Sequence, residues 1–391
     1  MSSLRTVSIP EERHILALDG LRGLAILLVL FAHSCGRPMS EAGTWVGRAL
    51  IHIADKGWTG VDLFFVLSGF LITRILLDAR TATNYFRVFY ARRILRIFPI
   101  YYLSLIFFFW ILPFLAHHST FFYLHRIGEF SPYEQLWYWF NLVNFRTAFY
   151  PLLIPVVSHY WTLSIEEQFY AVWPAIVRLC TPRQLAIICS SVITAVFVLR
   201  QIPAFLAINA VYDNFLYRLT PFRVDSLLFG ALVALLFYQS EFTAAQRQRL
   251  FRAAIVIFLL ALAVLLCFVS PDPAQGHYSF TLLAILYSAL LVACLTGTSV
   301  ACIFRFAPLR TFGKYSYSMY IFHSLVFRWG SIFIAHFTGP KLFPKHGYGS
   351  TVIQAAVLIL LCLGVARISW LLIEEPTLRL KKYFRYVELP N

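Results

Sequence analysis

Apolar residues along this chain form long runs that alternate with short polar segments. A helix needs about 20 apolar residues to cross the hydrocarbon core of a bilayer, and ten runs approach or exceed that length. The predicted spans are residues 15–35, 59–78, 94–114, 159–179, 184–200, 222–240, 252–270, 279–300, 314–337 and 351–373. One further run, 133–145, is short for a crossing, and we expect a re-entrant or interfacial helix there. The pattern therefore predicts an all-α, polytopic transmembrane helical bundle of about ten spans.

The composition agrees with a membrane location for most of the chain. Hydrophobic residues make up 60% and charged residues 13%, whereas a soluble domain carries roughly 25% charged residues. The formal net charge is +15, but the basic residues stand between apolar runs, so the positive-inside rule explains them without a nucleic-acid partner. The seven cysteines have no CxxC spacing, and we interpret them as small apolar residues rather than metal ligands or disulfides.

The distribution of basic residues predicts how the chain is oriented. If both termini are cytoplasmic and 133–145 does not cross, about twice as many Lys and Arg residues face the cytoplasm as face the other side. A crossing at 133–145 would reverse every later loop and weaken this bias. The first fourteen residues lack a cleavable signal pattern, so we expect the first span to stay as an anchor. We expect residues 1–391 to form a single transmembrane domain without an appended extracytoplasmic domain.

Ionisable residues inside spans are costly and are candidates for function. In the first span, Asp19 and Arg22 are three residues apart and can pair on one helical face. His33 lies deeper, where an imidazole can take or give a proton near neutral pH. The alternative is a packing histidine that is bonded to a neighbouring carbonyl.

In the second span, Asp62 stands near one end, as expected of an interfacial carboxylate that caps the helix. Ser68 is followed by a glycine, which favours close helix packing over chemistry.

Before the third span, the segment FYARRILRIFP contains Arg92, Arg93 and Arg96. Guanidinium groups suit phosphates, including those of a nucleotide-bearing donor such as coenzyme A. A topological anchor that binds lipid head groups explains the same residues equally well.

Two adjacent carboxylates, Glu166 and Glu167, lie within the otherwise apolar segment HYWTLSIEEQFYAVWP. They project about 100° apart on a helix, so we do not expect them to act as one pair. Glu166 shares a face with Thr162 and Tyr170, whereas Glu167 is expected to face water or Arg178. Two acids at this depth favour a functional role over packing.

Later polar residues form two further groups. Arg223 and Asp225 begin one span, and Ser316, Tyr320 and His323 line one face of another at spacings of four and three. Interhelical hydrogen bonding is the alternative role for these residues. We expect no metal site, because the pair at 117–118 has no third ligand nearby and no zinc spacing appears.

Taken in order, these motifs resemble the acyltransferase-3 family of integral membrane O-acyltransferases. The matching segments cover residues 18–376, nearly the whole chain; they are LDGLRGLAILLVLFAH, GVDLFFVLSGFLIT, FYARRILRIFP, HYWTLSIEEQFYAVWP, RVDSLLFGALVA, FGKYSYSMYIFH and IEEP. One such segment would be weak evidence, whereas seven in the same order are specific.

The resemblance implies roles for several residues. The arginine and essential histidine of the family's first span match Arg22 and His33, and its RxxR pair, which is thought to serve the acyl-coenzyme A donor, matches Arg93 and Arg96. The family's glutamate in the SLxxE segment matches Glu166. The usual WSL reads WTL here, and an acid replaces a common basic residue in the closing IEEP. The family also implies a bacterial inner membrane.

The resulting hypothesis is transfer of an acyl group, with acetyl expected, from acetyl-coenzyme A to a hydroxyl of a carbohydrate or small-molecule acceptor. The acceptor can lie on the same side of the bilayer as the donor or on the opposite side. Arg93 and Arg96, with Arg92 beside them, would hold donor phosphates. His33 would act as a general base or carry the acyl group, and Glu166 would orient or charge-balance the imidazole. The alternative is a proton-coupled transporter or flippase for a glycan or acidic substrate, which intramembrane acids, histidines and arginines also suit.

Overall fold

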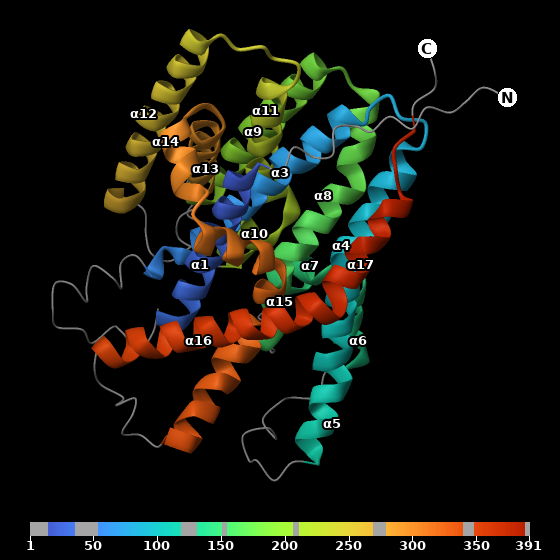
Figure 1. Ribbon diagram of the computed structural model, residues 1–391, viewed down its shortest axis with the longest axis vertical. Coiled ribbons are helices and arrows are strands. Elements are labelled where there is room, and N and C mark those ends of the chain that lie inside the picture. The colour runs from blue at the N-terminus through green and yellow to red at the C-terminus, as the bar shows by residue number, and fades with distance from the viewer. Residues whose placement is uncertain are drawn as a thin grey trace.

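The computed structural model describes residues 15–35, 54–118, 131–150, 155–205, 211–268, 279–338 and 348–387, and these residues form helices joined by turns (Figure 1). The helices are α1 (Leu16–Cys35), α3 (Gly60–Asp78), α4 (Tyr85–Ile106), α5 (Leu112–His117), α6 (Pro132–Trp139), α7 (Val143–Phe149), α8 (Tyr160–Leu179), α9 (Pro182–Phe205), α10 (Val211–Arg218), α11 (Val224–Phe237), α12 (Ala244–Phe268), α13 (Ser279–Thr296), α14 (Thr298–Phe304), α15 (Ala307–Thr338), α16 (Tyr348–Ser369) and α17 (Glu375–Arg379). Short 3-10 turns lie at Gly57–Thr59, Pro155–Val157, Thr220–Phe222 and Leu380–Tyr383, and π-helical turns lie at Phe107–Ile111 and Trp370–Glu374. The predicted all-α bundle is confirmed.

Each predicted span coincides with a helix, although the lengths differ. Within the described residues, seven helices are long and apolar enough to cross a bilayer. Of the other three predicted spans, α8 and α15 are long but carry many polar side chains, and α11 has only 14 residues. The third span begins earlier than predicted, because α4 already starts at Tyr85 and includes the arginine-rich segment.

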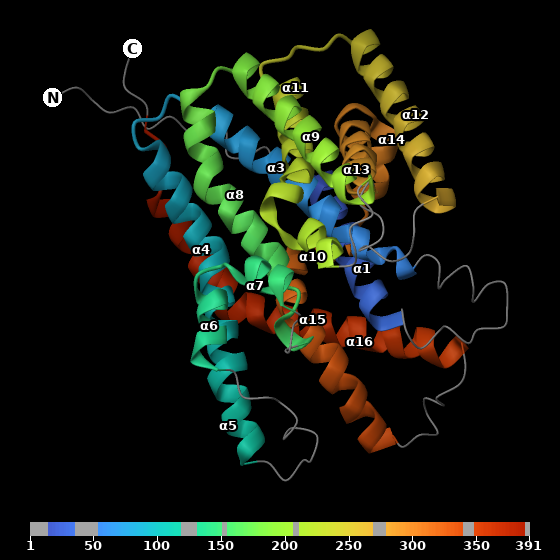
Figure 2. The ribbon, with the colours of Figure 1, turned by 180° about the vertical axis from the view of Figure 1, so that it is seen from behind.

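The short run at 133–145 does not cross as one helix. It divides into α6, with eight residues, and α7, with seven. Ser131 caps α6 by accepting a hydrogen bond from the Glu134 amide, and Asn141 breaks the run with a φ of 54°. Of the two pieces, α6 lies beside α4 and α7 lies beside α8 (Figure 2). The expectation of a short, non-crossing segment is confirmed.

The centre of the bundle is built from helices that approach closely. In the Gly57–Asp78 span, 72% of the most apolar 18-residue stretch is buried inside the protein. The corresponding share in Ala244–Cys267, at the periphery, is 17%. Helices α3 and α11 run in the same direction, with Asp62 near the start of one bonded to Ser226 near the start of the other. They pack closely through Gly69 and Gly230, where an added Cβ would meet backbone atoms of the other helix. This close contact brings polar side chains of α3 next to those of its neighbours.

Candidate functional site

A cavity of about 100 Å³ lies between α1, α3, α4, α8 and α15, and we call it the arginine pocket. Its polar lining consists of Arg22, Ser68, Arg93, Arg96, Thr162, Glu166, Glu167, Tyr170, Ser316, Tyr317 and Tyr320. Residues that are up to about 300 positions apart in the sequence therefore meet at one point. Several predicted site residues are among them.

The contacts within the arginine pocket link its acids to its bases. The Ser68 hydroxyl donates a 2.8 Å hydrogen bond to Glu166, so Ser68 has a polar contact that the packing interpretation did not include. Arg22 and Asp19 form the predicted ion pair, with 3.6 Å between Nη1 and Oδ1. The Arg93 guanidinium lies 5.7 Å from the centre of the Tyr170 ring. These contacts hold cationic groups beside carboxylates in a partly open space.

Two neighbouring charged residues differ in where the structure places them. Glu167 lines the arginine pocket beside Glu166 and is partly exposed there, which agrees with the expectation that it faces water. Arg92 lies outside the pocket, and its Nε donates a 2.8 Å hydrogen bond to the carbonyl of Phe384 near the C-terminal end of the described chain. On a helix the side chains of adjacent residues project about 100° apart, which separates Arg92 from Arg93.

Three imidazole rings form a second group, which we call the histidine cluster: His33, His159 and His323. The ring centres of His33 and His323 are 4.9 Å apart, and those of His159 and His323 are 4.5 Å apart. Ser324 lies between two of the rings, with Oγ 3.2 Å from His159 Nδ1 and 3.3 Å from His323 Nε2. In the described part of the chain, no group of three or more His, Cys, Asp or Glu side chains has the arrangement of a metal site.

The role of Glu166 toward His33 stays a prediction. In the structure Glu166 accepts a hydrogen bond from Ser68, and the ring in contact with His33 is that of His323. His159 was missed by the sequence reasoning, although it stands at the start of the HYWTL segment, directly before α8. The predicted shared face of Tyr320 and His323 is confirmed, with their ring centres 5.6 Å apart.

The protonation of His33 follows from its backbone contact. Nδ1 lies 2.8 Å from the carbonyl oxygen of Val29, one turn earlier in α1. A carbonyl oxygen only accepts hydrogen bonds, so in the neutral ring Nδ1 carries the proton and Nε2 carries the lone pair. His33 is exposed, whereas His159 and His323 are buried. Nε2 of His33 therefore has the character of a base at the edge of the bundle.

A third group consists of ion pairs without exposed surface, and we call it the ion-pair cluster: Asp62, Arg200, Arg223 and Asp225. Arg223 donates to Asp62 at 2.9 Å, and Arg200 donates to Asp225. All four side chains are 0% exposed. The expectation of an interfacial, capping Asp62 is therefore wrong.

Neighbouring groups complete the ion-pair cluster. Ser226 donates a 3.0 Å hydrogen bond to Asp62, and Thr281 donates a 3.2 Å bond to Asp225. The Phe280 ring lies 3.8 Å from the Arg223 guanidinium. Arg200 was not among the predicted site residues, because it stands at the end of a predicted span. These arginines are matched by acids and packed by an aromatic ring, as a structural role requires.

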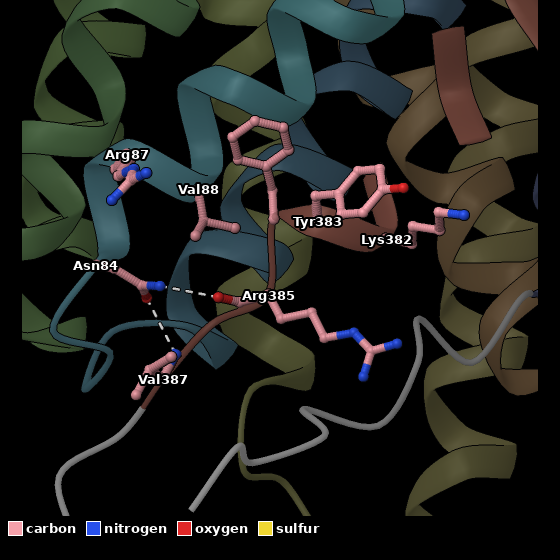
Figure 3. A pocket seen from close by; sticks show the side chains of 8 residues that line it. Asn84, Arg87, Val88, Lys382, Tyr383, Arg385 and Val387 are labelled. Carbon is pink, nitrogen blue, oxygen red and sulfur yellow. Dashed lines mark hydrogen bonds between the residues drawn. The ribbon is translucent and has the colours of Figure 1, made fainter. Parts of the chain in front are cut away.

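A larger cavity of about 280 Å³ lies between the start of α4 and the chain after α17 (Figure 3). Asn84 holds that segment by donating to the Arg385 carbonyl at 2.8 Å and accepting from the Val387 amide at 3.0 Å. Arg87 and Lys382 also line it. Arg87, which lines this cavity, and Arg96, which lines the arginine pocket, are nine residues apart, so they project from opposite sides of α4. This cavity is therefore not a continuation of the arginine pocket.

Fold and sites together define a polytopic membrane protein in which arginines and carboxylates gather around a cavity between helices, with three histidines close to one of its lining tyrosines. The chain belongs to the acyltransferase-3 family: the family model, described as an acyltransferase domain, matches residues 15–373.

Curated proteins similar to the chain include the peptidoglycan O-acetyltransferase OatA of Listeria monocytogenes, which is 26% identical over 80% of this chain and 49% of its own length. The O-acetyltransferase OatA of Staphylococcus aureus is 26% identical over 97% of this chain and 60% of its own length. The chain thus spans about half to three fifths of these relatives. No solved structure matches it.

Proposed function

We propose that the protein transfers an acetyl group from acetyl-coenzyme A to a hydroxyl group of a carbohydrate acceptor. The observation that carries this proposal is the continuity between the arginine pocket and the histidine cluster. Tyr320 lines the pocket, its ring contacts that of His323, and the His323 ring contacts that of His33. A cation-rich cavity and a basic imidazole thus lie on either side of one tyrosine.

The arginine pocket suits the donor. Along α8 it extends from Thr162 to Tyr170, eight residues or about 12 Å of helix. Arg93 lies at the Tyr170 end, and we assign the donor phosphates to Arg93 and Arg96, because guanidinium groups bind phosphates in a planar, two-pronged geometry. The acyl end of an extended donor then points toward Thr162 and the histidine cluster.

His33 suits the chemical step. Its Nε2 lone pair takes the proton of the acceptor hydroxyl while the hydroxyl oxygen attacks the acetyl carbonyl carbon. The bond between that carbon and sulfur breaks, and the thiolate of coenzyme A leaves and takes the proton from the imidazolium. The products are the acetyl ester of the acceptor and free coenzyme A. The name of the Listeria monocytogenes relative includes peptidoglycan, so we propose a peptidoglycan-type sugar as the first acceptor to test.

The test is transfer of labelled acetyl groups from acetyl-coenzyme A to isolated cell-wall saccharides by purified wild type and His33→Ala. We expect the variant to lose transfer but to bind acetyl-coenzyme A, because His33 does not line the arginine pocket. Retained transfer would remove His33 from the mechanism. A wild type that moves an unmodified saccharide across a vesicle membrane without consuming the donor would favour the transporter instead.

A further inference from the structure

Tyr320 occupies the junction between the arginine pocket and the histidine cluster. Its side chain lines the pocket, and its ring centre lies 5.2 Å from that of His159 and 5.6 Å from that of His323. Phe64 of α3 packs against the same ring at 6.2 Å. The ring is therefore fixed on several sides, while its hydroxyl group lies among polar partners.

The hydroxyl of Tyr320 shares its partners with the hydroxyl of Thr162. The two oxygens are 2.7 Å apart, and either group can be the donor. The His159 carbonyl oxygen lies 3.0 Å from Thr162 Oγ1 and 3.3 Å from the Tyr320 oxygen. The carbonyl only accepts, so these contacts allow more than one arrangement of the two protons.

One of these arrangements leaves the Tyr320 proton available to a ligand. If Thr162 donates to the Tyr320 oxygen, the tyrosine keeps one short hydrogen bond as an acceptor and turns its own proton toward the pocket. This arrangement gives up the contacts of both hydroxyl groups to the His159 carbonyl, which still accepts a 3.3 Å hydrogen bond from the Thr162 amide. A donor that is held in place and released toward the cavity is the arrangement that stabilises a developing oxyanion.

We propose that the Tyr320 hydroxyl donates a hydrogen bond to the acyl carbonyl oxygen of the donor, with Thr162 as the residue that positions it. This proposal rests on the proposed function. When the acceptor oxygen bonds to the carbonyl carbon, the carbonyl electron pair moves to its oxygen, which becomes negative. The Tyr320 bond strengthens at that moment, and it weakens again when the carbonyl re-forms and the thiolate leaves.

The test compares two tyrosine-to-phenylalanine variants. Tyr320→Phe removes one oxygen and keeps the ring that packs against the histidines. Tyr287→Phe is the matched control, because Tyr287 is also buried and bonded to a threonine, Thr59, at 2.6 Å, but lies outside the arginine pocket. For each variant, kcat for acetyl transfer and the Kd for acetyl-coenzyme A would be measured.

We expect Tyr320→Phe to lower kcat by about 100-fold, the size of effect seen when one oxyanion donor is removed. The Kd should stay within about threefold, because the bond forms fully only in the transition state. Tyr287→Phe should keep the wild-type kcat. Thr162→Val should lower kcat by about tenfold. Thr162→Ser retains a hydroxyl and should therefore have a higher kcat than Thr162→Val.

Equal kcat values for Tyr320→Phe and Tyr287→Phe would overturn the proposal, and so would a loss of acetyl-coenzyme A binding in Tyr320→Phe. Neither result would contradict the proposed function, which fails instead if the wild type does not transfer acetyl groups from acetyl-coenzyme A.

Discussion

Two regions of this bundle contain the same kinds of charged side chain in opposite arrangements. In the ion-pair cluster, each arginine faces one aspartate, and all four side chains are 0% exposed. In the arginine pocket, Arg22, Arg93 and Arg96 surround a cavity together with two glutamates that are only partly buried. An ionisable residue in a membrane span is thus not by itself a sign of catalysis. What distinguishes the two regions is space for a ligand.

The comparison gives each region its own response to mutation. Charges in the closed cluster have no solvent to replace a lost partner, so their removal should act on stability. Charges around the cavity already face a space that water or a ligand can fill, so their removal should act on binding and turnover.

The largest expected effect is on stability. Arg223→Met leaves the Asp62 carboxylate buried without its partner, and removal of one partner of a buried ion pair costs about 3–5 kcal/mol. The free energy of unfolding in detergent would measure it. The double variant Asp62→Leu with Arg223→Met removes both charges and should recover most of the loss. A single variant as stable as the wild type would break the comparison.

A smaller effect is expected from Glu166→Gln in the open pocket. The amide keeps an acceptor for Ser68 but loses the charge that faces the neighbouring guanidinium groups, so their placement changes, and kcat should fall by about 10- to 100-fold. The free energy of unfolding should change by less than about 1 kcal/mol, as for most substitutions at accessible positions. A large loss of stability with unchanged kcat would assign Glu166 to the structural class.

The smallest effect is expected from Ser68→Ala, which removes one hydrogen bond to Glu166. Such a bond contributes about 0.5–1.5 kcal/mol, which corresponds to a loss of about two- to tenfold in activity. Ser164→Ala is a suitable control, because Ser164 is buried on α8 and bonds only the carbonyl of Tyr160. Equal activities of the two variants would show that the Ser68 contact has no part in turnover.

Hydropathy predicted the helices well, because the requirement to span hydrocarbon acts locally along the chain. It was less informative for α11, which has only 14 residues. The motifs also identified Arg22, Arg93 and Glu166, and the structure brings these residues to one cavity.

The partners of the charged residues were harder to predict, because they depend on how helices pack. Arg223 meets Asp62 across 161 residues of sequence, and no local spacing indicates that pairing. Arg92 and Arg93 are neighbours in one motif, but only the position of the chain after α17 shows that Arg92 faces away from the pocket. His159 stands outside the predicted site for the same reason, since its contacts come from α15.

The central claim is that the arginine pocket binds the acyl-coenzyme A donor, and calorimetric titration with acetyl-coenzyme A tests it most directly. The wild type would be compared with Arg93→Ala/Arg96→Ala and with Arg92→Ala, a neighbouring arginine outside the pocket. Charge-assisted contacts contribute about 1.5–3 kcal/mol each, so we predict that the double variant loses measurable binding while Arg92→Ala keeps the wild-type Kd. Equal loss in both variants, or full binding by the folded double variant, would contradict the account.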